Sequence, residues 1–411
     1  MLDQFGFYKF NEKKYFSRFQ MMQDCQDPQK VSFHYNDEFF SQFSWLTEPS
    51  ISLDQLYRNR AEELRNTYDY LVLFYSGGSD SENILHTFVD NDIHIDEICH
   101  NVVGFEDKDS YMNSEVYNIA IPKVKLMQDR GKLVGTTHTI YDWSLNTVSG
   151  KFLDDDYLSW SNLATAYVTS KPHGATAERL GTPKWKELIS SGKRVAFIHG
   201  YDKPRIFRHN GQFSFRFSDA IHQITSFRDS LVRGILPAAA DESFYWAPKT
   251  TCANIIIKQC HVIKNFINTK GYDTLLRTIY QMGGFSGEVN VHARNHAGGR
   301  DYDLDYDLGG NILKDILYSS WSNKLDDFYN IKRKVRYNIK PAGNVITEKA
   351  DWFVAGNSSI ADKYLSTIKK SQESISTAWF DVSRPTSVAN VHGRQYYNWL
   401  RKINSRSYYF S

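Results

Sequence analysis

The chain has 411 residues, of which 41% are hydrophobic and 15% aromatic, and its formal net charge is +2 at pH 7. This composition excludes an intrinsically disordered chain, and the small net charge predicts no strong general attraction to nucleic acids or acidic membranes. The length exceeds what one ordinary core accommodates, so we expect two domains, or one large domain with appendages.

The cysteines and the apolar runs exclude further classes of protein. Cys25, Cys99, Cys252 and Cys260 are scattered without a Cys-x-x-Cys pair, which argues against a zinc site, an iron–sulfur cluster or a disulfide framework. We expect them to be buried small hydrophobic residues. The N-terminus lacks the apolar region of a signal peptide, and no apolar run reaches the length of a membrane span. A cytoplasmic protein without a membrane partner is therefore expected.

The first elements in chain order are an irregular extension and a helix. Residues 1–51 are rich in aromatic side chains and are expected to form a packed N-terminal extension. Ser52 and Gln55 have the spacing of a capping box, and apolar residues then recur at helical intervals, so a helix is predicted to start here.

Apolar segments alternate with amphipathic segments between residues 70 and 199. We expect strands at residues 70–75, within 93–105, at 132–141 and at 194–199, and helices after residue 81 and at 114–130, 157–168 and 175–190. Strands separated by helix-length segments favour a mostly parallel sheet with helices on both faces, which is a doubly wound α/β fold. In such sheets, ligands bind beyond the carboxyl ends of the strands.

The character of the sequence changes after residue 200. Asn210-Gly211 stands between two arms of alternating aromatic residues, which predicts a β-hairpin over residues 205–217. The α/β domain is expected to span residues 52–235. Residues 236–411 are expected to form a mixed, partly helical C-terminal domain for the substrate, with a helix near residues 255–269.

One short segment, SGGSDS at residues 76–81, lies between the first expected strand and the next helix. Two glycines allow the backbone to approach a bound group closely, and a helix N-terminus attracts anions, so the segment predicts a phosphate site. Serine hydroxyls add donors, and a carboxylate beside phosphates requires a metal between them, which makes Asp80 the expected Mg²⁺ ligand. A surface turn would explain the glycines but not the strand before them and the helix after them.

These residues carry a family resemblance. They match the signature SGGxDS through Ser76, Gly77, Gly78, Ser79, Asp80 and Ser81. The chain thus resembles the PP-loop ATP pyrophosphatases, closest in outline to the synthetase domain of asparagine synthetase, over residues 52–205. The resemblance implies the adenine nucleotide α-hydrolase-like (HUP) fold, with ATP and Mg²⁺ as cofactors. It also implies that ATP is cleaved between its α and β phosphates, with AMP passing to a substrate oxygen.

The resemblance also implies roles for the segment HGYDKPR, which lies at the end of the strand expected at residues 194–199. Gly200 ends the strand and joins the expected nucleotide-binding residues. Asp202 resembles the acidic residue that provides a second metal contact. Lys203 and Arg205 would neutralise the α-phosphate or the pyrophosphate. The longer glycine-acidic loop of the family is not reproduced here, and an ordinary solvated turn is the alternative interpretation.

Adenine recognition in this family uses the main chain at the end of the second strand, so the resemblance makes Val103 an expected contact. The second residue is Leu2, whereas a glutamine-hydrolysing asparagine synthetase has a nucleophilic cysteine there, and no built-in ammonia source is expected. The expected function is an adenylating ligase or amidotransferase-like enzyme that activates the carboxylate or amide oxygen of a small molecule.

Two alternatives stay open. The tail over residues 382–411 interleaves basic and aromatic residues and contains no acidic residue, which is typical of contact with single-stranded nucleic acid. A PP-loop enzyme that modifies tRNA or another nucleic acid is therefore the first alternative, although the same residues could clamp the tail onto the domain. A non-catalytic ATP-binding sensor is the second, and the intact Asp80 speaks against it.

Overall fold

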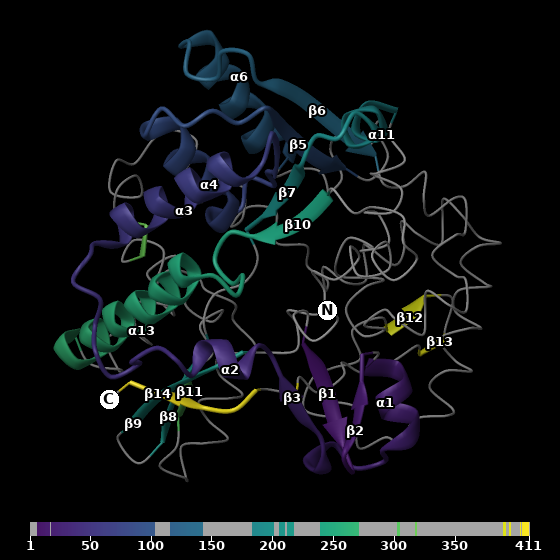
Figure 1. Ribbon diagram of the computed structural model, residues 1–411, viewed down its shortest axis with the longest axis vertical. Coiled ribbons are helices and arrows are strands. Elements are labelled where there is room, and N and C mark those ends of the chain that lie inside the picture. The colour runs from purple at the N-terminus through teal and green to yellow at the C-terminus, as the bar shows by residue number, and fades with distance from the viewer. Residues whose placement is uncertain are drawn as a thin grey trace.

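The computed structural model describes residues 6–16, 18–102, 116–142, 183–200, 205–209, 212–217, 239–270, 302–304, 317–318, 389–391, 394–395, 403 and 405–410. A five-stranded, all-parallel sheet forms their centre (Figure 1). Its strands are β4 (Tyr70–Phe74), β5 (Glu97–Val102), β6 (Thr137–Asp142), β7 (Val195–His199) and β10 (Ala239–Ser243). The expected α/β fold with a parallel sheet is thus confirmed.

The order of the strands, β10-β7-β4-β5-β6, determines where a ligand can bind. The chain first extends the sheet from β4 through β5 to β6, and then returns to the other side of β4 to add β7 and β10. The direction therefore reverses between β4 and β7. In open α/β sheets, a crevice forms at the carboxyl ends of the two strands on either side of such a reversal.

Apolar side chains cover both faces of the sheet. Leu71 and Leu73 of β4 belong to the large core cluster that also contains buried residues of α3 (Leu53–Thr67), α4 (Ser79–Asp90) and α6 (Ile121–Asp129). Val72 and Phe74, which point to the opposite face, belong to a second cluster with Trp185 of α11 (Pro183–Ser190). Because successive strand residues alternate between faces, a strand buried on both faces reads as a continuous apolar run, as YLVLF does.

Helices expected from the sequence are found among the described residues. The side chain of Ser52 caps α3, since its Oγ accepts a hydrogen bond from the backbone N–H of Gln55 at 3.2 Å. The expected helix over 114–130 is described from Val116, first as the π-helical turn η3 (Val116–Ala120) and then as α6. The helix expected near 255–269 is the longer α13 (Thr250–Lys270). The one expected over 157–168 lies outside the described residues.

One strand differs from its expected bounds. The segment 132–141 was expected to be extended throughout, but β6 begins only at Thr137. Gly131 and Gly135 adopt φ angles of +69° and +77°, a left-handed conformation that glycine tolerates and that ends regular structure. The chain turns over this stretch and enters the sheet five residues later than the start of the expected strand.

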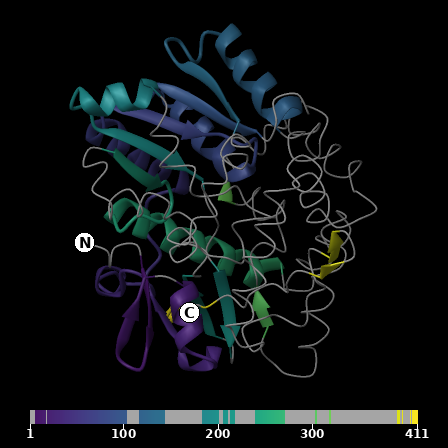
Figure 2. The same ribbon diagram turned by 90° about the vertical axis from the view of Figure 1, so that its right-hand side faces the viewer.

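The remaining described strands form smaller sheets. The N-terminal residues contribute β1 (Phe7–Phe10), β2 (Lys13–Tyr15) and β3 (Ser32–His34), with α1 (Arg18–Asp24), η2 (Pro28–Lys30) and α2 (Asp37–Phe40). The expected hairpin is confirmed as β8 (Arg205–His209) and β9 (Gln212–Arg216), which β11 (Tyr302–Leu304) and β14 (Tyr408–Tyr409) extend on either side. A separate pair joins β12 (Ala389–Val391) to β13 (Arg394–Gln395). In both views α13 lies between the parallel sheet and the two sheets formed by β1–β3 and by β8, β9, β11 and β14 (Figures 1 and 2).

The end of the chain is built into the fold. Tyr408 pairs with Phe215 of β9 and its ring stacks on that of Trp45, with 4.5 Å between centroids. Phe410 is fully buried, and its carbonyl oxygen accepts a hydrogen bond from the ammonium of Lys264. Because these aromatic faces are covered by protein, they favour the clamp over base stacking for this part of the tail.

Part of the C-terminal half completes the α/β domain. β10 lies beyond the expected boundary at residue 235, yet it pairs along its whole length with β7.

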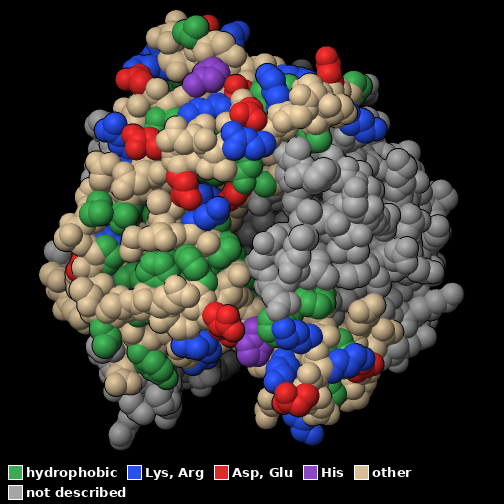
Figure 3. All heavy atoms as spheres, in the orientation of Figure 1, with side chains coloured by type: hydrophobic (Ala, Val, Ile, Leu, Met, Phe, Trp, Pro, Cys, Tyr) green, Lys and Arg blue, Asp and Glu red, His purple; other side chains and the backbone are tan. Residues whose placement is uncertain are grey.

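All four cysteines are free and buried, as expected. None of the helices in the described part of the chain combines the length and the apolar character needed to cross a membrane. Figure 3 shows basic and acidic side chains interspersed over the upper part of the molecule, which agrees with the small net charge.

Candidate functional site

The segment SGGSDS forms a tight loop at the carboxyl end of β4, at the reversal of the sheet. Gly77 has a φ angle of +76°, so this position lies in the left-handed region that side chains other than glycine rarely adopt. Gly78 is the N-cap residue of α4 and makes no side-chain cap hydrogen bond. The two glycines therefore have different roles: the first turns the backbone, and the second begins the helix without a capping side chain of its own.

Two serines hold the loop in shape. Ser76 Oγ accepts the backbone N–H of Gly78 at 3.2 Å, and Ser81 Oγ donates to the carbonyl oxygen of Gly78 at 2.9 Å. Ser81 Oγ also accepts the backbone N–H of Ser76 at 3.3 Å, which closes the loop at its base. The loop is thus preformed by its own hydroxyls.

The first turn of α4 gives the loop its electrostatic character. The first N–H groups of an α-helix have no partner within the helix, and the aligned peptide dipoles place partial positive charge at that end. A glycine cap supplies no side-chain oxygen to these groups, so an anion is a suitable partner. The residues of the turn, Ser79, Asp80 and Ser81, are those expected from the sequence, and Ser79 and Ser81 are both buried.

Gly200 brings the end of β7 against this turn. A Cβ atom built at Gly200 would lie 2.8 Å from the backbone nitrogen of Ser81 and 3.0 Å from the carbonyl carbon of Asp80. These neighbours are backbone atoms and cannot swing away. The glycine expected at this strand end therefore permits close packing of the end of β7 on the first turn of α4.

Replacing Gly200 with alanine tests this packing. We expect Gly200→Ala to destabilise the protein by about 1–3 kcal/mol and to weaken the nucleotide binding that the sequence predicts for the loop, because the added methyl group pushes the first turn of α4 away. The control is Gly131→Ala, which has no atom within 4 Å of the added Cβ but a φ angle of +69°. It should lose stability through backbone strain and bind nucleotide normally. Equal nucleotide binding by the two variants in a calorimetric titration would contradict the role given to Gly200.

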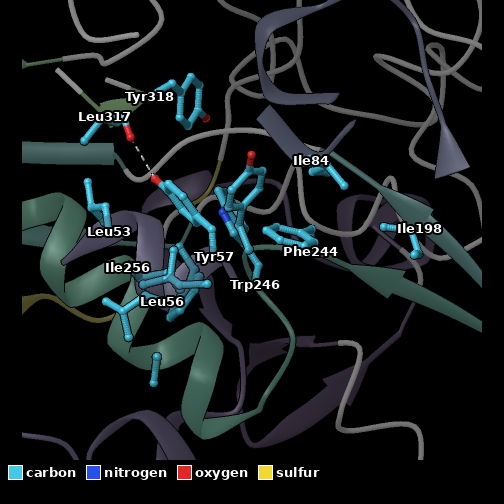
Figure 4. Close-up of a cluster of buried hydrophobic side chains, with 14 of the residues drawn as sticks. Leu53, Leu56, Tyr57, Ile84, Ile198, Phe244, Trp246, Ile256, Leu317 and Tyr318 are labelled. Carbon is cyan, nitrogen blue, oxygen red and sulfur yellow. Dashed lines mark hydrogen bonds between the residues drawn. The ribbon is translucent and has the colours of Figure 1, made fainter. Parts of the chain in front are cut away.

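Asp80, the expected metal ligand, lies in contact with two tyrosines from the C-terminal half. The hydroxyl of Tyr318 donates to Oδ1 of Asp80 at 2.5 Å, and the hydroxyl of Tyr245 donates to its backbone carbonyl oxygen at 2.9 Å. Burial raises the pKa of Tyr245 well above its usual value, so this hydroxyl stays protonated and remains a donor. Figure 4 shows Tyr318 near Tyr57, whose hydroxyl points to the carbonyl oxygen of Leu317.

The donor set around Asp80 suits Mg²⁺ only together with phosphates. Within the residues that the structure describes, no group of three or more His, Cys, Asp and Glu side chains is arranged to hold a metal ion. Mg²⁺ is commonly bound by one or two carboxylates plus substrate phosphates and water. A single carboxylate beside an anion-binding loop fits that pattern, so Asp80 would hold the ion once the nucleotide is present.

A buried ionic cluster supports α4 behind the loop. Glu82, in the first turn, forms a close ion pair with Lys123 of α6 and accepts a hydrogen bond from the hydroxyl of Tyr75. Burial opposes the ionisation of Glu82, but the imidazole of His86, whose Nε2 lies 3.3 Å from Oε1 of Glu82, and the charge of Lys123 outweigh it and lower the pKa of Glu82 to about 2. Glu82 is therefore ionised, and its contacts with Lys123 and Tyr75 stabilise the position of α4 behind the loop.

The structure brings some of the expected site residues together and does not describe others. The six residues of SGGSDS form one continuous turn, and Gly200 packs directly against its last two residues. Val103, Asp202 and Lys203 lie outside the described residues. Arg205 is described only through its backbone, which begins β8 opposite Arg216.

Sequence reasoning missed Tyr245 and Tyr318. Tyr245 follows the last strand of the sheet by two residues, a position that would have drawn attention had β10 been expected. Tyr318 reaches Asp80 across a sequence separation of 238 residues, and the chain has 26 tyrosines, so nothing in the local pattern distinguished it.

Comparison of the chain with protein-family models, with curated proteins and with solved structures returns no match. The arrangement of the residues themselves therefore carries the functional interpretation.

Proposed function

We propose that the protein binds ATP and Mg²⁺ at Ser76–Ser81 and transfers AMP to the oxygen of a small carboxylate or amide, releasing pyrophosphate. It would then be an adenylating ligase or amidotransferase-like enzyme of the PP-loop type, on an adenine nucleotide α-hydrolase-like fold. One observation carries the proposal: an SGGSDS loop, held by its own serines, lies at the start of a helix at the reversal of a parallel sheet.

The proposed reaction uses the loop to stabilise a leaving group. A substrate oxygen attacks the α-phosphorus of ATP, and the bond from that phosphorus to the bridging oxygen breaks. The electron pair goes to pyrophosphate, whose added negative charge the N–H groups of the first turn of α4 stabilise. A nucleophile such as an amine then attacks the adenylate, and AMP leaves.

The protein groups around the phosphates have separate tasks. Asp80 would hold Mg²⁺, which supplies charge neutralisation at the phosphate oxygens when bound. Asp202 is proposed as a second contact to the metal, and Lys203 and Arg205 as cations for the α-phosphate or pyrophosphate. The packing of Gly200 on the first turn of α4 supports this assignment, because Gly200 precedes Asp202 by two residues in the sequence.

Nucleotide product analysis tests the proposal. The protein is incubated with Mg²⁺ and ATP labelled in the α-phosphate, and amino acids, small carboxylates and total tRNA are added as separate pools. We expect AMP and pyrophosphate with one of the small-molecule pools. Turnover with tRNA alone would favour the nucleic-acid-modifying enzyme. ATP binding without AMP in any pool would favour the sensor, and ADP with phosphate would refute adenylation.

A further inference from the structure

Tyr318 makes a contact that links the C-terminal half of the chain to the nucleotide loop. Its side chain is fully buried, and its hydroxyl donates to Oδ1 of Asp80 at 2.5 Å. A hydrogen bond to a charged acceptor is shorter and stronger than one between neutral groups. The contact therefore fixes the orientation of the Asp80 carboxylate, the side chain proposed to bind Mg²⁺.

Neighbouring elements hold Tyr318 in place. The hydroxyl of Tyr57, on α3, donates to the carbonyl oxygen of Leu317 at 3.1 Å and accepts from Nε2 of Gln259, on α13, at 3.0 Å. The ring of Tyr318 lies 6.1 Å from that of Tyr57 and 6.4 Å from that of Tyr245, between centroids. Two helices and an aromatic cluster thus position the hydroxyl before any ligand binds.

We propose that Tyr318 is a positioning residue for the metal of the nucleotide complex. By donating to Oδ1 it fixes the orientation of the Asp80 carboxylate, the side chain proposed to bind the metal. A carboxylate has two acceptor oxygens, and a hydrogen-bonded partner that orients a metal ligand typically contributes 10–100-fold to metal affinity. This inference rests on the proposed function, since it assumes that Asp80 binds the metal of Mg-ATP.

The contact also couples two parts of the protein. If the bond from Tyr318 strengthens binding of the metal–nucleotide complex, then by linkage that complex strengthens the packing of residues 317–318 on α3 and α4 by the same factor. The C-terminal half, where the acceptor substrate is expected, is thereby joined energetically to the phosphate loop.

Binding of Mn²⁺ in the presence of ATP, followed by electron paramagnetic resonance, tests the proposal without relying on turnover. Tyr318→Phe keeps the ring and removes only the hydroxyl, and we expect its Mn²⁺ dissociation constant to rise by about 10-fold or more. Tyr35→Phe is the matched control, because it also removes a buried tyrosine hydroxyl, which donates to the carbonyl oxygen of Trp246 at 2.7 Å. It should bind Mn²⁺ as the wild type does.

Each outcome bears on a different claim. If the wild type binds no Mn²⁺ with ATP, both the proposed function and the role of Tyr318 fail. If the wild type and Tyr318→Phe bind equally, or if Tyr35→Phe weakens binding as much, only the role of Tyr318 fails. Should Tyr318→Phe not fold, hydrogen exchange of the wild-type peptide containing Leu317 and Tyr318 decides instead. Protection by Mn-ATP supports the coupling, and unchanged exchange overturns it.

Discussion

Asp80→Asn is expected to lower the rate of AMP and pyrophosphate formation by on the order of 10²–10³-fold, and to leave the fold intact. A metal ion at a phosphoryl centre contributes several kcal/mol to stabilisation of the transition state, and each 1.36 kcal/mol corresponds to a factor of ten in rate. Asparagine has nearly the same shape and keeps an oxygen that can accept from Tyr318. The variant therefore removes the charge proposed to hold the metal, with little change in packing.

The control for Asp80→Asn lies on the same helix. Asp90, at the last turn of α4, is about half exposed and bonds to His86, so Asp90→Asn removes an equal charge far from the loop. It should keep the wild-type rate. Product analysis with α-labelled ATP, beside thermal unfolding of each variant, gives both readouts. A wild-type rate for Asp80→Asn would show that this carboxylate does not hold the catalytic metal.

The sequence allowed the sheet to be predicted because its signals are local. A parallel strand buried on both faces is a short apolar run, as in β4 and β7, and a turn of type Asn-Gly identifies the hairpin β8–β9. The order of the strands depends on which run pairs with which, and β10 was missed for that reason. Its sequence, AADES, is short and carries two acidic residues, and it becomes a strand only because β7 offers it an edge.

In the candidate site, too, the local features could be predicted from the sequence and the long-range contacts could not. The loop SGGSDS is contiguous, so its residue types and their order could be interpreted before the fold was known. Tyr245 and Tyr318 contact Asp80 although they lie 165 and 238 positions from it in the sequence. No periodicity or spacing in the sequence predicts such a contact. Gly200 could be predicted only in part. Its place at a strand end was expected from the sequence, but only the fold shows that a glycine is needed there because the backbone of Ser81 packs against it.

Arg60 is the other residue whose role only the fold discloses. It lies on α3, where the sequence resembles any charged helix surface, yet its side chain is 1% exposed. The guanidinium donates to Oε2 of Glu242 at 2.6 Å and to the carbonyl oxygen of Ser243 at 3.1 Å. Oε1 of Glu242 in turn accepts from the hydroxyl of Tyr68. The cluster joins α3 to the edge strand β10 and so closes the α/β domain with residues from beyond its expected boundary.

Arg60→Met is expected to destabilise the protein by about 3–5 kcal/mol, the largest effect on stability among the variants considered. Methionine has a flexible apolar side chain that can fill much of the space, but Glu242 is left buried without its counter-charge, and breaking a buried ion pair from one side costs about this much. Denaturant unfolding measures the change. Arg58→Met, two residues earlier on α3, removes an exposed partner of Glu62 and should cost at most about 0.5 kcal/mol.

A second substitution separates the charge of Glu242 from the packing of Arg60. Adding Glu242→Gln to Arg60→Met removes the uncompensated charge, so the double variant should be more stable than Arg60→Met alone, and the two changes should be strongly non-additive. If the double variant instead loses the sum of both single effects, the arginine stabilises β10 through its backbone contacts and not through the ion pair. Either way, the free energy of unfolding shows how β10 is held in the sheet from which the loop SGGSDS extends.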